Sequence, residues 1–255
     1  MARNGDTPKK LKLYVLEGSH PCAAVEAALE LKSIPYSRVN LTLPLTQMVV
    51  GPIMYGGMTV PGARIDGERI VGSRKIMRRL DELAPEPPLL PADTSRRAQV
   101  LEAERWGDED FQSVPRRVLD AAWLRNAACM ESYGGDIKLP VPRSMLRPAL
   151  PLTARLMALR NKAKDENVVA DLKALPAQLE KIDAWIAEGV LGSEQPNAAD
   201  LQIGCTLRLL NTAADVRPLL ESHPAMGLTR YFPAVAGEVP AGTLPAEWLP
   251  VPTGV

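Results

Sequence analysis

The sequence carries no excess of charge of either sign. Its 255 residues include 30 basic and 30 acidic side chains, so the formal net charge at pH 7 is zero. Proteins that bind nucleic acid or an anionic membrane usually present a surplus of basic side chains. We therefore expect neither nucleic acid nor a membrane surface as a partner.

Cysteine and long apolar runs are also scarce. The three cysteines, Cys22, Cys129 and Cys205, are too few and too scattered for a disulfide framework or a zinc site. We expect free thiols in a reducing compartment and no metal. No apolar run approaches the roughly 18 to 20 residues that a membrane-spanning helix requires, and residues 1–10 lack the apolar core of a secretion signal. The sequence thus predicts a cytoplasmic protein.

Aromatic residues make up only 4% of the chain, but hydrophobic residues as a whole make up 46%, which is enough for a sizeable core. With about 150 residues per domain as a starting estimate, the length suggests one or two domains. Four prolines between residues 85 and 91 divide the chain into a first part of mixed pattern and a second part of helical pattern.

The first part opens with a strand that leads into a helix. Residues 11–15 alternate between apolar and partly polar side chains, as in a half-buried strand, and the pattern ends at Gly18. Pro21 suits the first position of a helix, and the segment after it is rich in alanine. The strand therefore delivers Ser19 and His20 to a helix N-terminus, where free N–H groups and the helix dipole favour an anion such as a thiolate.

The remaining elements are expected from apolar spacing, turn residues and prolines. In the first part, these are a strand over 36–41, one or two helical turns within 43–55, strands ending at Ile65 and spanning 69–71 around an Asp66-Gly67 turn, and a helix capped by Ser73. The second part is expected to begin with a long helix from Thr94 or Ser95 through Met130, bent at Pro115, followed by an irregular connection over 133–151. A helix over 152–188, interrupted at Pro176, comes next, and the capping box Asn197 to Asp200 opens a further helix. The tail from Pro233 is expected to be an extended strap that does not pack.

This organisation resembles a cytosolic glutathione transferase over nearly the whole chain. Four segments carry the resemblance: Ser19 to Cys22, Thr59-Val60-Pro61, Gly72-Ser73 and Asn197 to Asp200. It implies an α/β plus all-α fold, in which a thioredoxin-like domain of order β-α-β-α-β-β-α precedes a helical bundle. The implied boundaries are a thiol-binding domain over 1–84, a proline-rich linker over 85–92, a helical domain over 93–232 and an extended tail over 233–255.

The resemblance also implies a thiol site. Ser19 would donate a hydrogen bond to the sulfur of the thiol, and Thr59 and Val60, with a cis bond to Pro61, would pair with its backbone. Ser73 would bind the γ-glutamyl carboxylate of glutathione. Gly72 stands where the family usually has Glu or Gln, so both glutathione and another low-molecular-weight thiol are considered as the cofactor.

Several residues have both a chemical and a structural interpretation. Cys22 is a candidate redox nucleophile, but it shares one helical face with Val25 and Leu29 and would then be a buried apolar residue. His20 is a candidate general base or ligand contact. Trp106 and Phe111 could line an electrophile pocket or belong to the core. The cations Arg74, Lys75, Arg78 and Arg79 could meet an acidic ligand, a dimer partner or only water.

The leading hypothesis for function is an enzyme of detoxification, a glutathione S-transferase-like protein that conjugates a thiol to a small electrophile. As in the family, it would be a homodimer. Two alternatives are a non-catalytic scaffold that has lost the cofactor site and a thiol-disulfide oxidoreductase that uses Cys22. If the protein is an enzyme, Ser19, His20 and Cys22 are the candidate catalytic residues.

Overall fold

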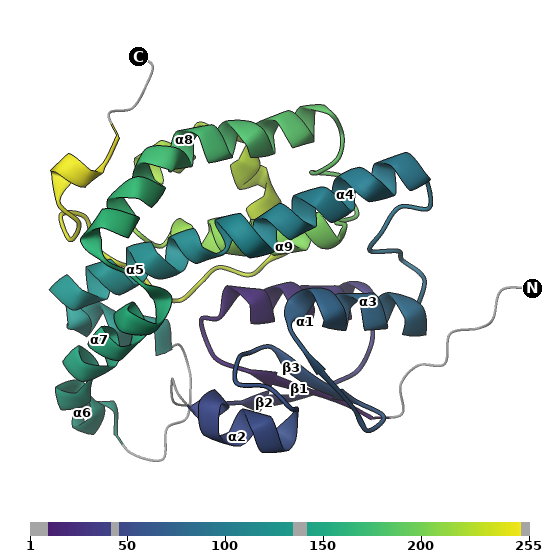
Figure 1. Cartoon of the computed structure of the whole chain (residues 1–255), viewed down its shortest axis with the longest axis horizontal. Helices are drawn as coiled ribbons and strands as arrows, with labels where there is room; N and C mark the ends of the chain where they lie inside the picture. The colour runs from purple at the N-terminus through teal and green to yellow at the C-terminus, as the bar shows by residue number, and fades with distance from the viewer. Residues whose placement is uncertain (1–9, 42–45, 135–141, 251–255) are drawn as a thin grey trace, which may run out of the picture.

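The computed structural model describes residues 10–41, 46–134 and 142–250. Figure 1 shows a small sheet with α1 and α3 on one face and α2 on the other, and the helices of the second part of the chain above α1 and α3. Pro44, part of the ambiguous 43–55 segment, lies outside the described residues, as does Pro252 of the tail.

The first part of the chain forms a four-stranded sheet flanked by three helices. Its elements in order are β1 (Leu11–Val15), α1 (His20–Leu31), β2 (Ser37–Asn40), α2 (Thr46–Met54), β3 (Gly62–Ile65), β4 (Glu68–Val71) and α3 (Ser73–Leu83). The strand order is β2-β1-β3-β4, with β1 parallel to β2 and antiparallel to β3. This is the predicted β-α-β-α-β-β-α arrangement of a thioredoxin-like domain.

The rest of the chain is helical. Its α-helices are α4 (Thr94–Trp106), α5 (Ser113–Arg125), α6 (Arg143–Leu146), α7 (Leu150–Asn161), α8 (Asp165–Ala187), α9 (Ala198–Leu210) and α10 (Arg217–Leu220). A π-helical turn over 107–111 joins α4 to α5, and short 3-10 helices occupy 127–134, 147–149, 224–231 and 246–248. Nearly every residue of α9 is buried, because α1, α4, α5 and the 224–231 turn all pack around it.

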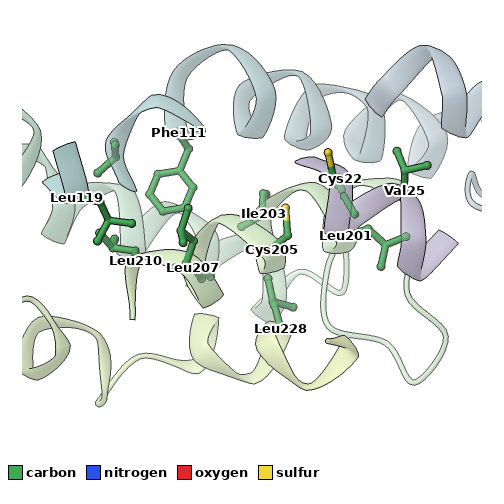
Figure 2. Close-up of a cluster of buried hydrophobic side chains, with 14 of the residues drawn as sticks. Cys22, Val25, Phe111, Leu119, Leu201, Ile203, Cys205, Leu207, Leu210 and Leu228 are labelled. Atoms are coloured by element: carbon green, nitrogen blue, oxygen red, sulfur yellow. The ribbon is translucent and has the colours of Figure 1, made fainter. Parts of the chain in front are cut away.

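One apolar core joins the two parts of the chain. Figure 2 shows Cys22 and Val25 of α1 beside Leu201 and Ile203 of α9. Phe111 and other side chains of the second part continue the same core. Because α1 lies between the sheet and α9, the N-terminus of α1 is held where both parts of the chain can reach it.

Two predicted helix breaks lie elsewhere than expected. Pro115 is in the first turn of α5, where proline costs no helical hydrogen bond. The irregularity comes just before it, where the N–H of Gln112 donates to the carbonyl of Gly107 at 2.9 Å, one residue beyond helical spacing. Pro176 lies inside the continuous helix α8, and the break falls between α7 and α8, at Lys162 with a φ of 56°.

Helix starts also differ in part from expectation. Ser73 does not cap α3: it is the first residue of that helix, and Gly72 occupies the cap position with a φ of 96°. Pro21 is the second residue of α1, one position later than expected. The capping box of α9 is confirmed, since Asn197 and Asp200 each accept from the backbone N–H of the other.

The C-terminal tail packs against the helices, contrary to the expectation of a loose strap. Val239, Leu244 and Trp248 are buried. Val239 forms an isolated bridge with Ala213, and the guanidinium of Arg125 lies 4.2 Å from the ring centre of Trp248. The described part of the tail therefore contributes side chains to the core.

The start of the proline-rich segment is fixed by a buried lysine at the end of α1. The ammonium group of Lys32 donates to the carbonyls of Ala84 at 2.6 Å and Pro87 at 2.8 Å, and it pairs with Asp81 at 2.7 Å. Asp81 also accepts from the N–H of Leu89 at 2.9 Å. These bonds tie α1, α3 and the segment after α3 together.

Among the described helices, none is long and apolar enough to cross a membrane. The described residues also contain no group of three or more His, Cys, Asp or Glu side chains that could hold a metal ion.

Candidate functional site

A cavity of about 360 Å³ lies where the β1 to α1 corner meets the second part of the chain. Ser19 and His20 line it from the start of α1, and Thr59 and Val60 line it from the loop before β3. Side chains of α5, α7 and α9 form the opposite wall. Of the sequence-predicted site residues, the cavity brings together these four and leaves out Cys22, Pro61, Gly72 and Ser73.

Ser19 is the residue that caps α1, but its side chain makes no capping hydrogen bond. It is half-buried, and its backbone N–H donates to the carbonyl of Leu16 at 3.1 Å. The strand β1 therefore ends in a tight corner that places Ser19 on the wall of the cavity. Its hydroxyl also makes a hydrogen bond with the thiol of Cys22 on α1, and a ligand sulfur would compete for it.

His20 is buried, and its Nε2 atom has no hydrogen-bond partner among the described residues. Burial lowers the pKa of His20 well below its usual value, and the positive charge of Arg116 lowers it further, although a backbone hydrogen bond with Gln112 opposes both. The imidazole is therefore neutral at physiological pH. It can exchange a hydrogen bond with a ligand without adding charge to the cavity.

The cysteines are poor candidates for thiolate chemistry. Cys22 lies in the core beneath Ser19, and burial raises its pKa to about 12 despite the opposing effect of the Ser19 hydroxyl. Burial also raises the pKa of Cys205 to about 12 and that of Cys129 above its usual value. A nucleophilic cysteine needs a lowered pKa and access to solvent. Cys22 is therefore a buried residue of the core and not a nucleophile.

This placement predicts slow alkylation of all three thiols. In the folded protein at pH 7.5, we expect iodoacetamide to modify Cys22 at least about a hundredfold more slowly than a free cysteine, because its thiolate form is disfavoured. Mass spectrometry of a time course measures the rates, with the urea-unfolded chain as the control. Rapid and selective modification of Cys22 in the folded protein would instead support the oxidoreductase alternative.

The loop before β3 presents an unpaired stretch of backbone. The bond between Val60 and Pro61 is cis, as expected, and the carbonyl of Pro61 accepts from the N–H of Gly72 at 2.9 Å. The N–H and C=O of Val60 have no hydrogen-bond partner in the part of the chain that the structure describes. They can pair with the backbone of a peptide-like ligand.

The start of α3 differs from the expected carboxylate site. The hydroxyl of Ser73 is buried and donates to Oε1 of Gln202 on α9 at 3.1 Å. Gly72 has a φ of 96°, which side chains rarely adopt, although a Cβ atom there would meet no atom within 4 Å. Gly72 thus supplies no side chain to a ligand, and the hydroxyl of Ser73 already donates its proton inside the protein.

The opposite wall of the cavity contains polar residues that the sequence analysis missed. Arg116 and Asp120 come from α5, and Arg160 and Asn161 come from the end of α7. Asn161 donates from Nδ2 to Oδ2 of Asp120 at 2.7 Å. Burial raises the pKa of Asp120 to about 7, although Asn161 and Arg116 both oppose the shift.

A signal for two of these residues is present in the sequence. Arg116, Asp120 and Trp123 follow one another at helical spacing, so two polar residues share a face with an aromatic one. Such a face is typical of a helix that lines a ligand cavity as well as a core.

A second cavity, of about 840 Å³, lies on the other side of the same corner. It shares Ser19 and His20 with the first, and α1, β2, the end of α9 and the segment after residue 231 contribute to its lining. Of its two cations, Arg38 is paired with Glu17 at 3.0 Å and with Glu26 at 2.6 Å, and Arg208 donates to the carbonyl of Ala234 at 3.4 Å. The corner of α1 is therefore open to ligands from two directions.

Trp106 and Phe111 belong to the core rather than to either cavity. Their rings stack with centres 5.2 Å apart, and Trp106 meets Trp185 edge to face at 5.4 Å. Both residues are buried.

The basic face of α3 is mostly neutralised within the chain. Arg74 and Arg78 both pair with the buried Glu104, and Arg79 pairs with exposed carboxylates. Lys75 is exposed. This face therefore offers little free charge to an acidic ligand.

Comparison with known proteins agrees with the fold. Residues 13–88 match the family described as glutathione S-transferase, N-terminal domain. The curated protein glutathione S-transferase Z1 from Arabidopsis thaliana is 36% identical over 110 residues, which are 40% of this chain and 47% of that protein. The match thus spans about half the length of that relative.

Two solved structures extend the likeness to most of the chain. A glutathione S-transferase from Rhodospirillum rubrum F11 has 24% identity and a TM-score of 0.56, covering 87% of this chain and 86% of its own. The beta-etherase LigF from Sphingobium sp. strain SYK-6 has 20% identity and a TM-score of 0.63, covering 87% of this chain and 94% of its own. At these identities the likeness shows the shared fold.

Proposed function

We propose that the protein is a transferase that joins a low-molecular-weight thiol to a small electrophile. The match of its first part to the glutathione S-transferase N-terminal domain and the two-part fold that it shares with solved structures of that superfamily support the proposal. The observation that carries the proposal is the cavity at the α1 corner. Ser19 and Val60, the residues suited to a thiol, and the side chains of α5 and α7 line the same space. The two reactants can therefore meet there.

Part of the corner suits a peptide thiol such as glutathione. The unpaired N–H and C=O of Val60 match the backbone of a cysteine residue in a ligand. At the α3 end of the site, Gly72 has no side chain, and the Ser73 hydroxyl already donates a hydrogen bond to Gln202. A ligand carboxylate there would therefore depend on the backbone N–H groups at the start of α3. Glutathione and other small thiols therefore both stay within the proposal.

Ser19 has the main chemical role in this proposal. When bound, the thiol supplies the sulfur nucleophile. The Ser19 hydroxyl would donate a hydrogen bond to that sulfur, and the N-terminus of α1 behind it favours negative charge. Both effects stabilise the thiolate at neutral pH. His20, neutral and without a partner at Nε2 among the described residues, would accept or donate a hydrogen bond beside it.

Replacing Ser19 with alanine should lower turnover far more than thiol binding. A hydrogen bond to a charged sulfur is worth about 1.5 to 3 kcal/mol, so we expect kcat to fall by about ten- to a hundredfold. The dissociation constant of the thiol should change by less than about threefold, because the backbone at Val60 would hold the ligand.

Steady-state kinetics and thiol titration measure both quantities, with Ser95→Ala as the matched control. Ser95 is an exposed serine in the first turn of α4, far in sequence from the corner. A Ser19→Ala protein with wild-type kcat would show that Ser19 does not activate the thiol.

Titration calorimetry with glutathione and a panel of other cellular thiols tests the proposal as a whole. We expect at least one thiol to bind with a millimolar or lower dissociation constant. Binding of a thiol other than glutathione would be consistent with Gly72 at the start of α3. If no thiol binds, the alternative of a non-catalytic scaffold is favoured, since Gly72 and the bond from Ser73 to Gln202 already weaken the carboxylate end.

The wider setting is proposed by analogy with the superfamily. We propose a homodimer in the cytoplasm that acts in detoxification of small electrophiles. Size-exclusion chromatography with light scattering tests whether the protein is a homodimer. A mass near 27.7 kDa, that of one chain, would contradict the dimer.

A further inference from the structure

Within the described residues, two cations line the first cavity and have no carboxylate within ion-pair distance. Arg116 is half-buried, and its guanidinium donates through Nη2 to the neutral side chain of Gln112 at 2.6 Å. Arg160 extends from the last turn of α7 and makes no hydrogen bond or ion pair with the described residues. By contrast Arg117, the next residue on α5, is held by Asp171 through two hydrogen bonds of 2.5 and 2.6 Å.

A guanidinium that is partly shielded from water and has no carboxylate in contact is costly, because its charge loses water without gaining an ion pair in return. That cost shows in the pKa of Arg116, which burial lowers from its usual value. The carboxylates of Asp108 and Asp120 raise this pKa in part, whereas the positive charge of Arg160 lowers it further. The two cations are thus close enough to repel each other across the cavity. An anion between them would relieve both effects.

The acidic residues of the cavity do not supply that anion. Asp120 is not within ion-pair distance of Arg116, and with a pKa of about 7 it carries little charge in mildly acidic solution. Glu17 lines the cavity but pairs with Arg38 at 3.0 Å and accepts from Asn40 at 3.1 Å. His20 is neutral, and burial raises the pKa of Tyr133 to about 12, so that its phenol is neutral as well.

We propose that the electrophile is an anion, a small carboxylic acid, whose carboxylate binds between Arg116 and Arg160. This inference rests on the proposed function and names the substrate class of the same site. Arginine is well suited to the role, because its planar fork binds a carboxylate through two parallel hydrogen bonds. Leu119, Trp123 and Met157 make the neighbouring wall apolar, so the body of the substrate is apolar or aromatic.

A matched pair of probes separates charge from shape. The first is 3,5-dinitrobenzoate, and the second is its methyl ester, which has the same ring and no charge. Binding of each is measured by calorimetry without any thiol. We expect the carboxylate to bind at least tenfold more tightly than the ester. Equal affinities would overturn the inference.

Variants assign the difference to the two arginines. Arg160→Met, at an exposed position where folding is not at risk, should weaken binding of the carboxylate at least fivefold and leave the ester unchanged. Arg116→Gln should have a larger effect, and circular dichroism shows whether it folds. The control is Arg155→Met, since Arg155 is exposed on the same helix and does not line the cavity. An effect of Arg155→Met as large as that of Arg160→Met would contradict a specific site.

Reaction with 4-chloro-3,5-dinitrobenzoate and its methyl ester then tests substrate choice. The thiolate sulfur forms a bond to the ring carbon, the carbon–chlorine bond breaks, and chloride leaves. We expect kcat/KM to favour the carboxylate at least tenfold in the wild type and to lose that preference in Arg160→Met. Carboxylate binding without turnover would overturn the proposed function and support the anion site. Turnover with no preference for the carboxylate would support the proposed function and overturn the anion site.

Discussion

Asp200→Ala should unfold at a much lower urea concentration than the wild-type protein, with a free energy of unfolding reduced by about 2 to 4 kcal/mol. The carboxylate of Asp200 is fully buried and accepts from the N–H groups of Gly192 at 2.7 Å and Asn197 at 2.9 Å. Alanine leaves both half-buried donors without an acceptor, and each such group costs about 1 to 3 kcal/mol. Removal of a buried charge offsets part of this loss, since burial raises the pKa of Asp200 to about 6.

The position of Asp200 makes the effect global. It lies in the first turn of α9, the helix on which α1, α4 and α5 pack. Asp93→Ala is the matched control, because Asp93 caps α4 at the surface through one hydrogen bond from the N–H of Arg96 at 2.8 Å. A surface cap of this kind is worth about 1 kcal/mol. Equal losses in the two variants would show that the capping box of α9 is not specially important.

Asp120→Asn should stabilise the protein in alkaline solution by about 2 to 4 kcal/mol at pH 8. Burial raises the pKa of Asp120 from 3.8 to about 7 in the folded protein, so between these values the folded chain holds a proton that the unfolded chain has lost. The stability that this proton provides is fully present below about pH 4 and falls as the pH rises to about 7. Asparagine is neutral at every pH, so it avoids the loss.

Urea unfolding at several values between pH 4 and pH 8.5 measures this effect. The difference between Asp120→Asn and the wild type should be small at pH 4, because the amide oxygen that the substitution introduces can still accept from Asn161, and it should grow up to about pH 7. Asp171→Asn should instead be destabilised at pH 8, since it weakens the bonds from Arg117. Parallel curves for Asp120→Asn and the wild type would mean that the Asp120 carboxylate is not buried as described.

The first part of the fold follows from short-range patterns. Alternation over residues 11–15 identifies β1, and Asp66-Gly67 forms the expected turn, with φ values of 49° and 98°. The capping box at the start of α9 is equally local, because its partners are three residues apart. In each case the residues that determine the structure are neighbours in the sequence, so the sequence alone was sufficient.

Proline misled the prediction where its effect depended on position within a helix. Pro115 occupies the first turn of α5, where no helical hydrogen bond is lost. Pro176 sits within α8 between Leu172 and Leu179, both buried, and this packing holds the helix continuous across it. Only the tertiary contacts distinguish a tolerated proline from one that ends a helix.

The polar wall of the cavity was beyond prediction for a different reason. Asp120 and Asn161 are 41 residues apart and meet only because α5 and α7 pack together. The burial that raises the pKa of Asp120 is likewise a product of the whole fold. Ser19 and His20 could be proposed as site residues from their place between a strand and a helix. Arg116 and Arg160 could not, because only the packing of α5 and α7 places both of them on the cavity wall.

The bonds of Lys32 bear on how this protein could be recombined with its relatives. Its ammonium group has three donors, and the carbonyls of Ala84 and Pro87 and the carboxylate of Asp81 take all of them. A chimera that joins this N-terminal part to a foreign helical part should therefore place its junction after Leu89, whose N–H completes the same cluster through Asp81. A junction at Ala84 would put foreign chain at the position of Pro87, and the buried ammonium would keep its third acceptor only if that backbone followed the same path.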